Sequence, residues 1–239
     1  MSTGAKPNPS SNLPARRRQS VEGLALLAGI VALMWAIEAI NSLDHNGLDY
    51  GGGIIARDPD RLWAIFTAPF LHASFYPHLV DNTIPLVFMG VFIALRGARR
   101  LALVTLIVIV VGGLGTWLIS PSNTNTVGAS GLVFGYATYL FARGLFDRSW
   151  VEVVIGVLVA VVWGGALISS LVPHTGISWQ GHASGAVGGV VAAWLLAGRR
   201  QPVGWRSGGG RSGAGSGAGS DVPADHRPLH DALDRALGQ

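Results

Sequence analysis

Six apolar segments constrain the fold of this chain more than any other feature of its sequence. They lie at residues 22–41, 78–95, 101–119, 127–141, 150–172 and 177–197. Most of them approach the roughly 20 residues that a helix needs to cross a bilayer. A composition with 49% hydrophobic and 13% charged residues is also typical of a membrane protein. The sequence therefore predicts an all-α, polytopic membrane protein with a bundle of six transmembrane helices.

The segments divide the chain into three parts. Residues 1–20 are polar and are expected to form a disordered N-terminal tail, and residues 21–198 form the membrane domain. Residues 199–239 contain a Gly/Ser-rich run and are expected to form a disordered C-terminal tail. No small-residue cleavage pattern follows the first apolar segment, so we expect it to remain as an anchor.

Positive charge gathers on one side of the predicted bundle. The third and fifth connections contain no Lys or Arg, and the first contains only Arg57 and Arg61. This bias predicts that both termini are cytoplasmic, and we expect the membrane to be the plasma membrane of a prokaryote. Because the basic residues do not form an aromatic-interleaved surface, no nucleic-acid partner is expected. The cytoplasmic side carries Lys6, Arg16, Arg17, Arg18, Arg96, Arg99, Arg100, Arg143, Arg148, Arg199 and Arg200.

Polar residues interrupt the apolar segments in one layer. Ser130 begins the fourth segment, His182 lies early in the sixth, and His78 and Asn82 open the second. In the predicted topology all three segments enter the membrane from the outer side. Because a hydroxyl or an imidazole is costly in lipid, these four residues are candidates for a functional site.

The fourth segment is short, which bears on the depth of Ser130. The apolar run 127–141 has 15 residues, about 22 Å of helix against a hydrocarbon core of ~30 Å. If Arg143 holds its inner end at the cytoplasmic face, Ser130 lies several ångströms below the outer surface. Irregular backbone over residues 123–127 then requires a water-filled hollow. Such a hollow supplies water for hydrolysis.

Small residues favour a close approach of the fourth and sixth segments. Stripes of this kind let two helix backbones come near one another. Packing alone is a sufficient reason for any one stripe, but here the approach would also bring His182 to Ser130. The residues are Gly131 and Gly135 on the fourth segment and Gly181, Gly185 and Gly189 on the sixth.

Ser130 and His182 are suited to form a catalytic dyad. A serine hydroxyl needs a positioned base, and imidazole has a suitable pKa for that role. No acidic residue stands near either one in the sequence, so another group must orient His182. Phe134, one turn after Ser130 on the same helix face, is the candidate to pack against the ring. The alternative is that Phe134 is an ordinary lipid-facing or core aromatic residue.

His78 and Asn82 are candidates to stabilise an oxyanion. Their i, i+4 spacing puts them on one helix face, and acyl transfer needs donors of this kind beside the backbone N–H of the nucleophile. The alternatives are an interfacial histidine and an interhelical hydrogen bond from Asn82. Asp81 and Glu38 are expected near the outer interface or facing the hollow, without a catalytic role.

Together these motifs resemble the rhomboid family of intramembrane serine proteases. The matches are Gly-x-Ser-Gly at residues 128–131, His-x-x-Gly-x-x-x-Gly at residues 182–189 and His-x-x-x-Asn at residues 78–82. The similarity extends over residues 22–198, and residues 68–72 look like the end of the family's first loop. Phe134 stands where some relatives have a tyrosine.

The resemblance implies an endopeptidase in which Ser130 attacks a peptide carbonyl and His182 serves first as base and then as acid. The oxyanion would be held by Ser130 N–H, His78 and Asn82. Substrates would be transmembrane proteins, cut near the outer membrane surface within the lipid, and no cofactor or metal is expected. The oligomeric state is left open. Supporting positions are Gly128, Gly131, Phe134 and Gly185.

Two other classes of function are weighed against the protease. A catalytically inactive rhomboid-like protein that binds membrane clients is expected to lose the serine or the histidine, whereas this chain has both. A small transporter with a polar site at the membrane midplane predicts paired interruptions in two repeated halves. No such repeat is visible in the sequence.

Overall fold

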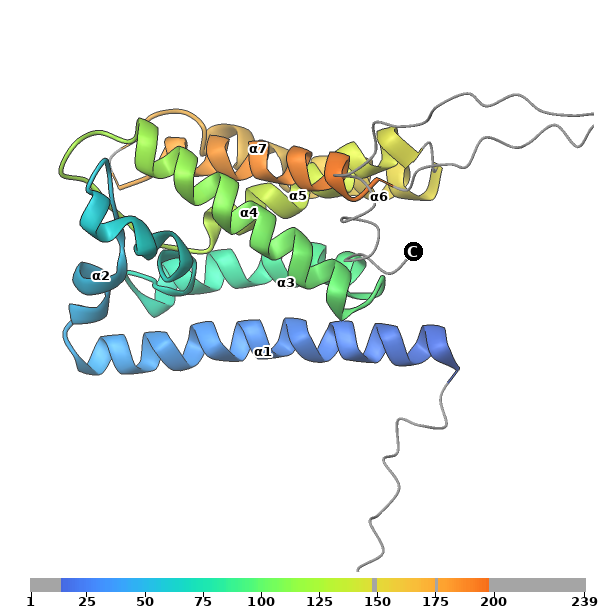
Figure 1. The fold of residues 1–239 in the computed structure, drawn as a ribbon, viewed down its shortest axis with the longest axis horizontal. Helices are drawn as coiled ribbons and strands as arrows, with labels where there is room; N and C mark the ends of the chain where they lie inside the picture. The colour runs from blue at the N-terminus through green and yellow to red at the C-terminus, as the bar shows by residue number, and fades with distance from the viewer. Residues whose placement is uncertain (1–13, 148–149, 175, 198–239) are drawn as a thin grey trace, which may run out of the picture. The chain divides into compact units, whose positions relative to one another are not determined.

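The computed structural model describes residues 14–147, 150–174 and 176–197. Within these ranges six helices have 15 residues or more, and Figure 1 shows how they are arranged. The prediction of an all-α membrane fold is confirmed. The six helices are α1 (Ala15–Leu43), α3 (Val80–Ala94), α4 (Ala98–Ile119), α5 (Ser130–Asp147), α6 (Trp150–Ser169) and α7 (Trp179–Leu195).

The connection between α1 and α3 is structured. It contains the short helix α2 (Gly47–Gly52), strand β1 (Ile54–Ile55) and two 3-10 segments, Pro59–Phe66 and Ala68–Phe70. A π-helical turn, Phe75–Leu79, leads into α3. Strand β1 pairs antiparallel with β2 (Asn125–Thr126), which lies shortly before α5. The first connection is therefore tied to the segment that carries Ser130.

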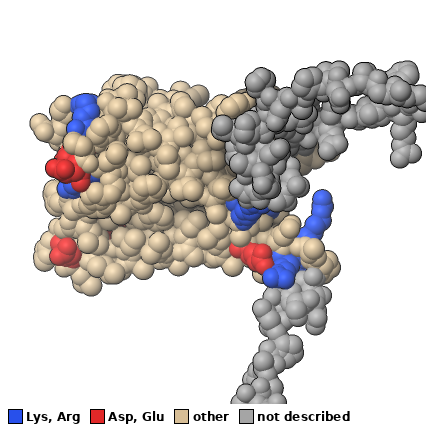
Figure 2. Space-filling view, in the orientation of Figure 1, with Lys and Arg blue, Asp and Glu red and all other residues tan. Residues whose placement is uncertain are grey.

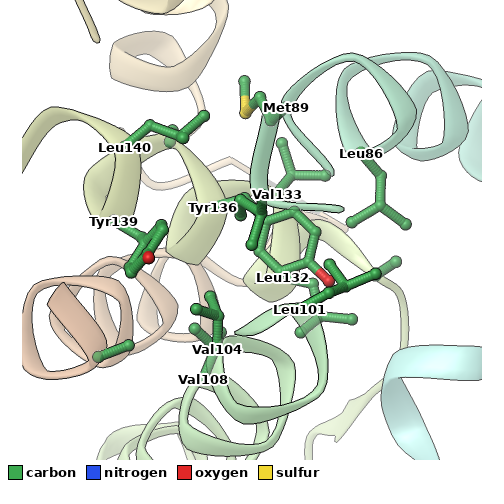
Figure 3. Close-up of a cluster of buried hydrophobic side chains, with 14 of the residues drawn as sticks. Leu86, Met89, Leu101, Val104, Val108, Leu132, Val133, Tyr136, Tyr139 and Leu140 are labelled. Atoms are coloured by element: carbon green, nitrogen blue, oxygen red, sulfur yellow. The ribbon is translucent and has the colours of Figure 1, made fainter. Parts of the chain in front are cut away.

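The apolar core lies where α3, α4 and α5 meet (Figure 3). Tyr136 is fully buried at its centre, and its hydroxyl is 2.6 Å from the hydroxyl of Thr105. This contact satisfies a polar group that would otherwise be costly to bury. Figure 3 labels the surrounding side chains Leu86, Met89, Leu101, Val104, Val108, Leu132, Val133, Tyr139 and Leu140.

Helices α5 and α7 approach one another through glycines. A Cβ placed on Gly185 would collide with the backbone of Gly131, and one on Gly189 would collide with the carbonyl of Gly135. Thr138 also donates a hydrogen bond across the pair to Ala186 O, at 2.7 Å. The small residues therefore permit a separation that larger side chains would prevent.

The distribution of charge fits a protein embedded in a bilayer. On the face shown in Figure 2, acidic and basic side chains lie toward the two ends of the bundle, with other residues between them. Among the described residues, three helices are long and apolar enough to cross a membrane: Ala15–Leu43, Phe75–Ala94 and Ala98–Ile119. The chain is an integral membrane protein. That all six long helices cross the bilayer stays a prediction.

Several boundaries differ from those predicted. Helix α5 runs from Ser130 to Asp147 and has 18 residues, about 27 Å at 1.5 Å per residue. The helix is therefore longer than the run 127–141 predicted, and it remains shorter than the ~30 Å hydrocarbon core. The helix continues past the apolar run because Arg143 is buried and donates a hydrogen bond to Leu196 O, beyond α7.

Helix α1 also begins earlier than predicted. Residues 15–20 are helical, although the sequence assigned them to the N-terminal tail. Arg18 pairs with Glu22 one turn later, at 2.8 Å, and such an i, i+4 pair supports a helix in a polar stretch. The remainder of both predicted tails, residues 1–13 and 198–239, lies outside the described residues.

Candidate active site

The four polar residues singled out from the sequence lie on the wall of one cavity. Ser130 of α5, His182 of α7, and His78 and Asn82 at the start of α3 all line a space of about 1170 Å³. Residues more than 100 positions apart in the chain are thus brought to one place. The cavity is large enough to admit an extended segment of polypeptide.

His182 is held in a defined orientation. Its side chain is buried, and its ring stacks on Phe134 with centroids 4.4 Å apart and planes 9° from parallel. Nδ1 lies 2.8 Å from Ser170 O. Because a carbonyl can only accept, Nδ1 carries the proton and Nε2 of the neutral ring is left as an acceptor. This is the tautomer that a general base requires.

Ser130 opens α5. The backbone N–H groups in the first turn of a helix have no acceptor within that helix. Ser130 is the first residue of α5, so its N–H can donate a hydrogen bond to a group outside the helix. The two helix starts are close, since a Cβ on Gly131 would lie 3.5 Å from Gly181 O. Among the described contacts, no hydrogen bond joins the side chains of Ser130 and His182; such bonds often tighten only when substrate binds.

His78 presents a donor toward the loop that precedes Ser130. Its Nδ1 accepts a hydrogen bond from Ala73 N–H at 3.1 Å, so Nε2 carries the proton of the neutral ring. Nε2 lies against Gly128, where an added Cβ would be only 2.6 Å away. Gly128 also has φ of +119°, a conformation that favours glycine. Both the backbone and the neighbouring imidazole therefore require glycine at this position.

Asn82 lies beside His78 on the same helix face. In this structure its Nδ2 donates to His78 O at 3.0 Å, within its own helix. A Cβ on Gly128 would be 3.7 Å from the same Nδ2. The amide is therefore near the loop that precedes Ser130, and the carbonyl of His78 accepts a hydrogen bond from one of its two protons.

Two groups in this site were given no role from the sequence. His72 is fully buried, and its Nε2 accepts a hydrogen bond from Ala129 N–H at 3.3 Å, immediately before Ser130. Its ring meets that of His78 edge to face, with centroids 5.1 Å apart. Burial, with a smaller contribution from His78, lowers the pKa of His72 to about 3. His72 is therefore a neutral acceptor that holds the loop preceding Ser130.

The second missed group is the backbone carbonyl of Ser170, which follows α6 and orients His182. A carbonyl is present in every residue, so no residue type marks this position. For His72 the only available signal was its place at the end of residues 68–72, which resemble a family loop. Gly128 N–H also bonds that loop, at Ala68 O (2.9 Å).

No grouping suited to a metal ion is found within the described ranges. There, no three or more His, Cys, Asp or Glu residues lie close enough to share an ion.

Comparison with known proteins places this arrangement in a family. The Rhomboid domain matches residues 59–199. An uncharacterized protein of Mycobacterium tuberculosis is 42% identical over 220 residues, covering 88% of this chain and 90% of the relative. One of Mycobacterium leprae is 42% identical over 202 residues, covering 81% and 78%.

A more distant relative carries a functional name. The "Putative rhomboid protease YdcA" of Bacillus subtilis is 27% identical over 141 residues, covering 58% of this chain and 69% of that protein. The matched domain covers more than half of this chain and includes Ser130, His182, His78 and Asn82. On this match, the chain belongs to the rhomboid family.

Proposed function

We propose that the protein is an intramembrane serine endopeptidase that acts through Ser130 and His182. The observation that carries the proposal is the setting of His182. Its Nδ1–H is bonded to Ser170 O and its ring is stacked on Phe134, which leaves Nε2 as an acceptor in the cavity that Ser130 lines. An imidazole held in this way can act as base toward a serine hydroxyl that comes within hydrogen-bond reach, which supports the proposed dyad.

The proposed reaction is acyl transfer followed by hydrolysis. Ser130 Oγ attacks a peptide carbonyl while His182 Nε2 takes its proton, giving a tetrahedral intermediate. His182 then gives that proton to the leaving amine as the C–N bond breaks. Water, activated by the same imidazole, attacks the acyl-enzyme and releases the new carboxylate and Ser130.

Three donors are available to the oxyanion. Ser130 N–H belongs to the first turn of α5, where the helix dipole also favours negative charge. His78 Nε2–H and the second proton of the Asn82 amide are the side-chain donors. Donors aimed at developing charge in a water-poor site are usually the largest single contribution to catalysis.

The proposed setting follows from the charge pattern. Arg100 donates to Leu196 O at 2.7 Å, and Arg143 bonds the same carbonyl at the C-terminal end of α7. By the positive-inside rule this end is cytoplasmic, and the cavity at the opposite ends of α5 and α7 opens toward the outer face. Single transmembrane proteins in a prokaryotic plasma membrane, surrounded by lipid, are the proposed substrates.

The test uses purified protein in liposomes with a model transmembrane substrate and a fluorophosphonate probe. Wild type is expected to cleave the substrate and to be labelled. Ser130→Ala and His182→Ala should each lower cleavage by about a thousandfold or more. Ser169→Ala is a matched control, because this hydroxyl bonds Ala166 O within its own helix.

The outcomes separate the proposal from its alternative. Labelling that persists in Ser130→Ala would reject the nucleophile. A folded wild-type protein that captures membrane clients, but neither cleaves them nor reacts with the probe, would support the inactive client-binding protein.

A further inference from the structure

Asp81 stands on the wall of the cavity and has no part in the proposed reaction. It lies in the first turn of α3, between His78 and Asn82 in the sequence, and its side chain is exposed. It lines the same cavity as Ser130 and His182. A group in this place meets whatever polypeptide enters the site.

Asp81 gives the cavity its charge. Among the described lining residues it is the only Lys, Arg, Asp or Glu; the others are apolar, amide, hydroxyl or histidine side chains and glycines. Its carboxylate is close enough to His78 for the two groups to interact electrostatically. A single carboxylate in a hollow with apolar walls is screened less than one on an open surface.

No basic residue of the described chain neutralises Asp81. The ion pair found in these residues joins Arg18 to Glu22, on a different helix. The two arginines of the first connection bond backbone carbonyls: Arg57 bonds those of Leu118 and Ser120, and Arg61 those of Tyr50 and Gly53. Any ion partner of the Asp81 carboxylate would therefore come from outside these residues.

The position of Asp81 also favours a bound polypeptide as its ion partner. Ile84, one turn later, and Trp163 of α6 line both the cavity and an adjoining apolar groove of about 610 Å³ between α3 and α6. Asp81 thus stands near the place where the apolar groove meets the cavity. A transmembrane segment that rests in the groove and unwinds into the cavity would pass this carboxylate near its cleaved bond.

We propose that Asp81 is a specificity-determining residue that selects substrates carrying Lys or Arg within a few residues of the cleaved bond. This inference rests on the proposed protease function. A substrate ammonium or guanidinium is attracted to the Asp81 carboxylate, whereas a substrate carboxylate is repelled. Long basic side chains also keep their charge near polar surroundings while the stem lies against apolar walls.

The experiment compares three substrates that differ only in one residue, which is Arg, Gln or Glu. The set is made for each of the four positions on either side of the cleaved bond. At one position, wild type should prefer Arg over Glu by about tenfold in kcat/KM. Asp81→Asn should reduce this ratio to about twofold or less, and Asp81→Lys should invert it. Asp81→Glu, which keeps the charge, should retain the preference for Arg.

Controls separate selectivity from folding and from chemistry. Asp60→Asn removes an exposed carboxylate that does not line the cavity and should leave the Arg-to-Glu ratio unchanged. Fluorophosphonate labelling of Ser130 reports that each variant is folded. The inference is overturned if wild type cleaves all three substrates equally, or if Asp81→Asn lowers all three rates by one factor. Absence of any Ser130-dependent cleavage, even of the Gln substrate, would instead reject the proposed function.

Discussion

The cavity wall has two halves, and different physical interactions hold them. Ser130 and His182 stand on α5 and α7, which touch backbone to backbone through glycines such as Gly131 and Gly185. His78 and Asn82 stand at the junction of the first connection with α3. There the contacts are hydrogen bonds from backbone N–H groups to the rings of His78 and His72.

The polar half extends away from the cavity. Asn41 Nδ2 donates to His72 O at 3.2 Å, and Asn41 Oδ1 accepts from Leu48 N–H at 3.1 Å. Glu38, fully buried one turn earlier in α1, accepts from Ser42 Oγ at 3.4 Å. Asp49 of α2 is also buried and interacts with Asn41. A chain of polar contacts thus links α1 and α2, through His72, to the loop that precedes Ser130.

The two kinds of contact predict different responses of the two halves to mutation and to pH. The glycine half packs backbone against backbone, so it should be sensitive to added volume. The polar half contains titratable groups, and a change in their protonation alters which hydrogen bonds they can accept. The stability of this half should therefore depend on pH. Each prediction below alters one half and leaves the other unchanged.

The largest effect is expected from adding volume to the glycine half. Gly185→Leu would place a side chain in the backbone of Gly131 and should lower the free energy of unfolding by about 3 kcal/mol or more, with loss of cleavage. Gly165→Leu on α6 is the matched control, because nothing lies within 4 Å of a Cβ there; its effect should stay within about 0.5 kcal/mol. Unfolding in mixed micelles, followed by tryptophan fluorescence, measures both. Equal effects of the two variants would show that α5 and α7 are no more tightly packed than α6.

A smaller effect, on pH dependence, is expected from the polar half. Because the pKa of His72 is lowered to about 3 from 6.5, its contribution to stability is present above pH 6.5 and is lost as pH falls toward 3. Between pH 7.5 and pH 5, wild type should lose up to about 2 kcal/mol through this group. His72→Gln keeps an acceptor for Ala129 N–H but has no titratable group, so its unfolding free energy should not show this loss between pH 7.5 and pH 5. The same unfolding measurement at the two pH values checks it, and identical slopes would mean that His72 is not held neutral by the fold.

The sequence predicted much of this arrangement, and the reasons are specific. Apolar runs long enough for a bilayer marked the helices, and Ser130, His182, His78 and Asn82 were found because hydroxyls, imidazoles and amides are rare in such runs. The structure brings these four residues to one cavity, as expected. The stacking of Phe134 on His182 was also anticipated from its place one turn after Ser130.

What the sequence could not supply depends on backbone groups and on long-range contacts. The carbonyl of Ser170 orients His182, and a carbonyl leaves no mark in a sequence. The role of His72 depends on the path of the first connection, which brings residue 72 to residue 129. The length of α5 was underestimated because hydropathy ended the helix at Phe141, whereas a tertiary contact of Arg143 carries it further.

The smallest effect is expected at Asp49, and its sign is opposite to that of His72. Burial raises the pKa of the Asp49 carboxyl, and the hydrogen bond from Asn41 partly offsets that rise. Its contribution to stability is therefore present below the unfolded pKa of about 3.8 and is lost as pH rises through the raised value. Asp49→Asn, neutral at every pH, should match wild type in unfolding free energy at pH 3.5 and exceed it at pH 7.5. Since both proteins keep His72, its titration cancels in the difference. If that difference were the same at both pH values, burial would not raise the pKa of the Asp49 carboxyl. The pH dependence of the polar half would then come from His72 and its neighbours in the cavity.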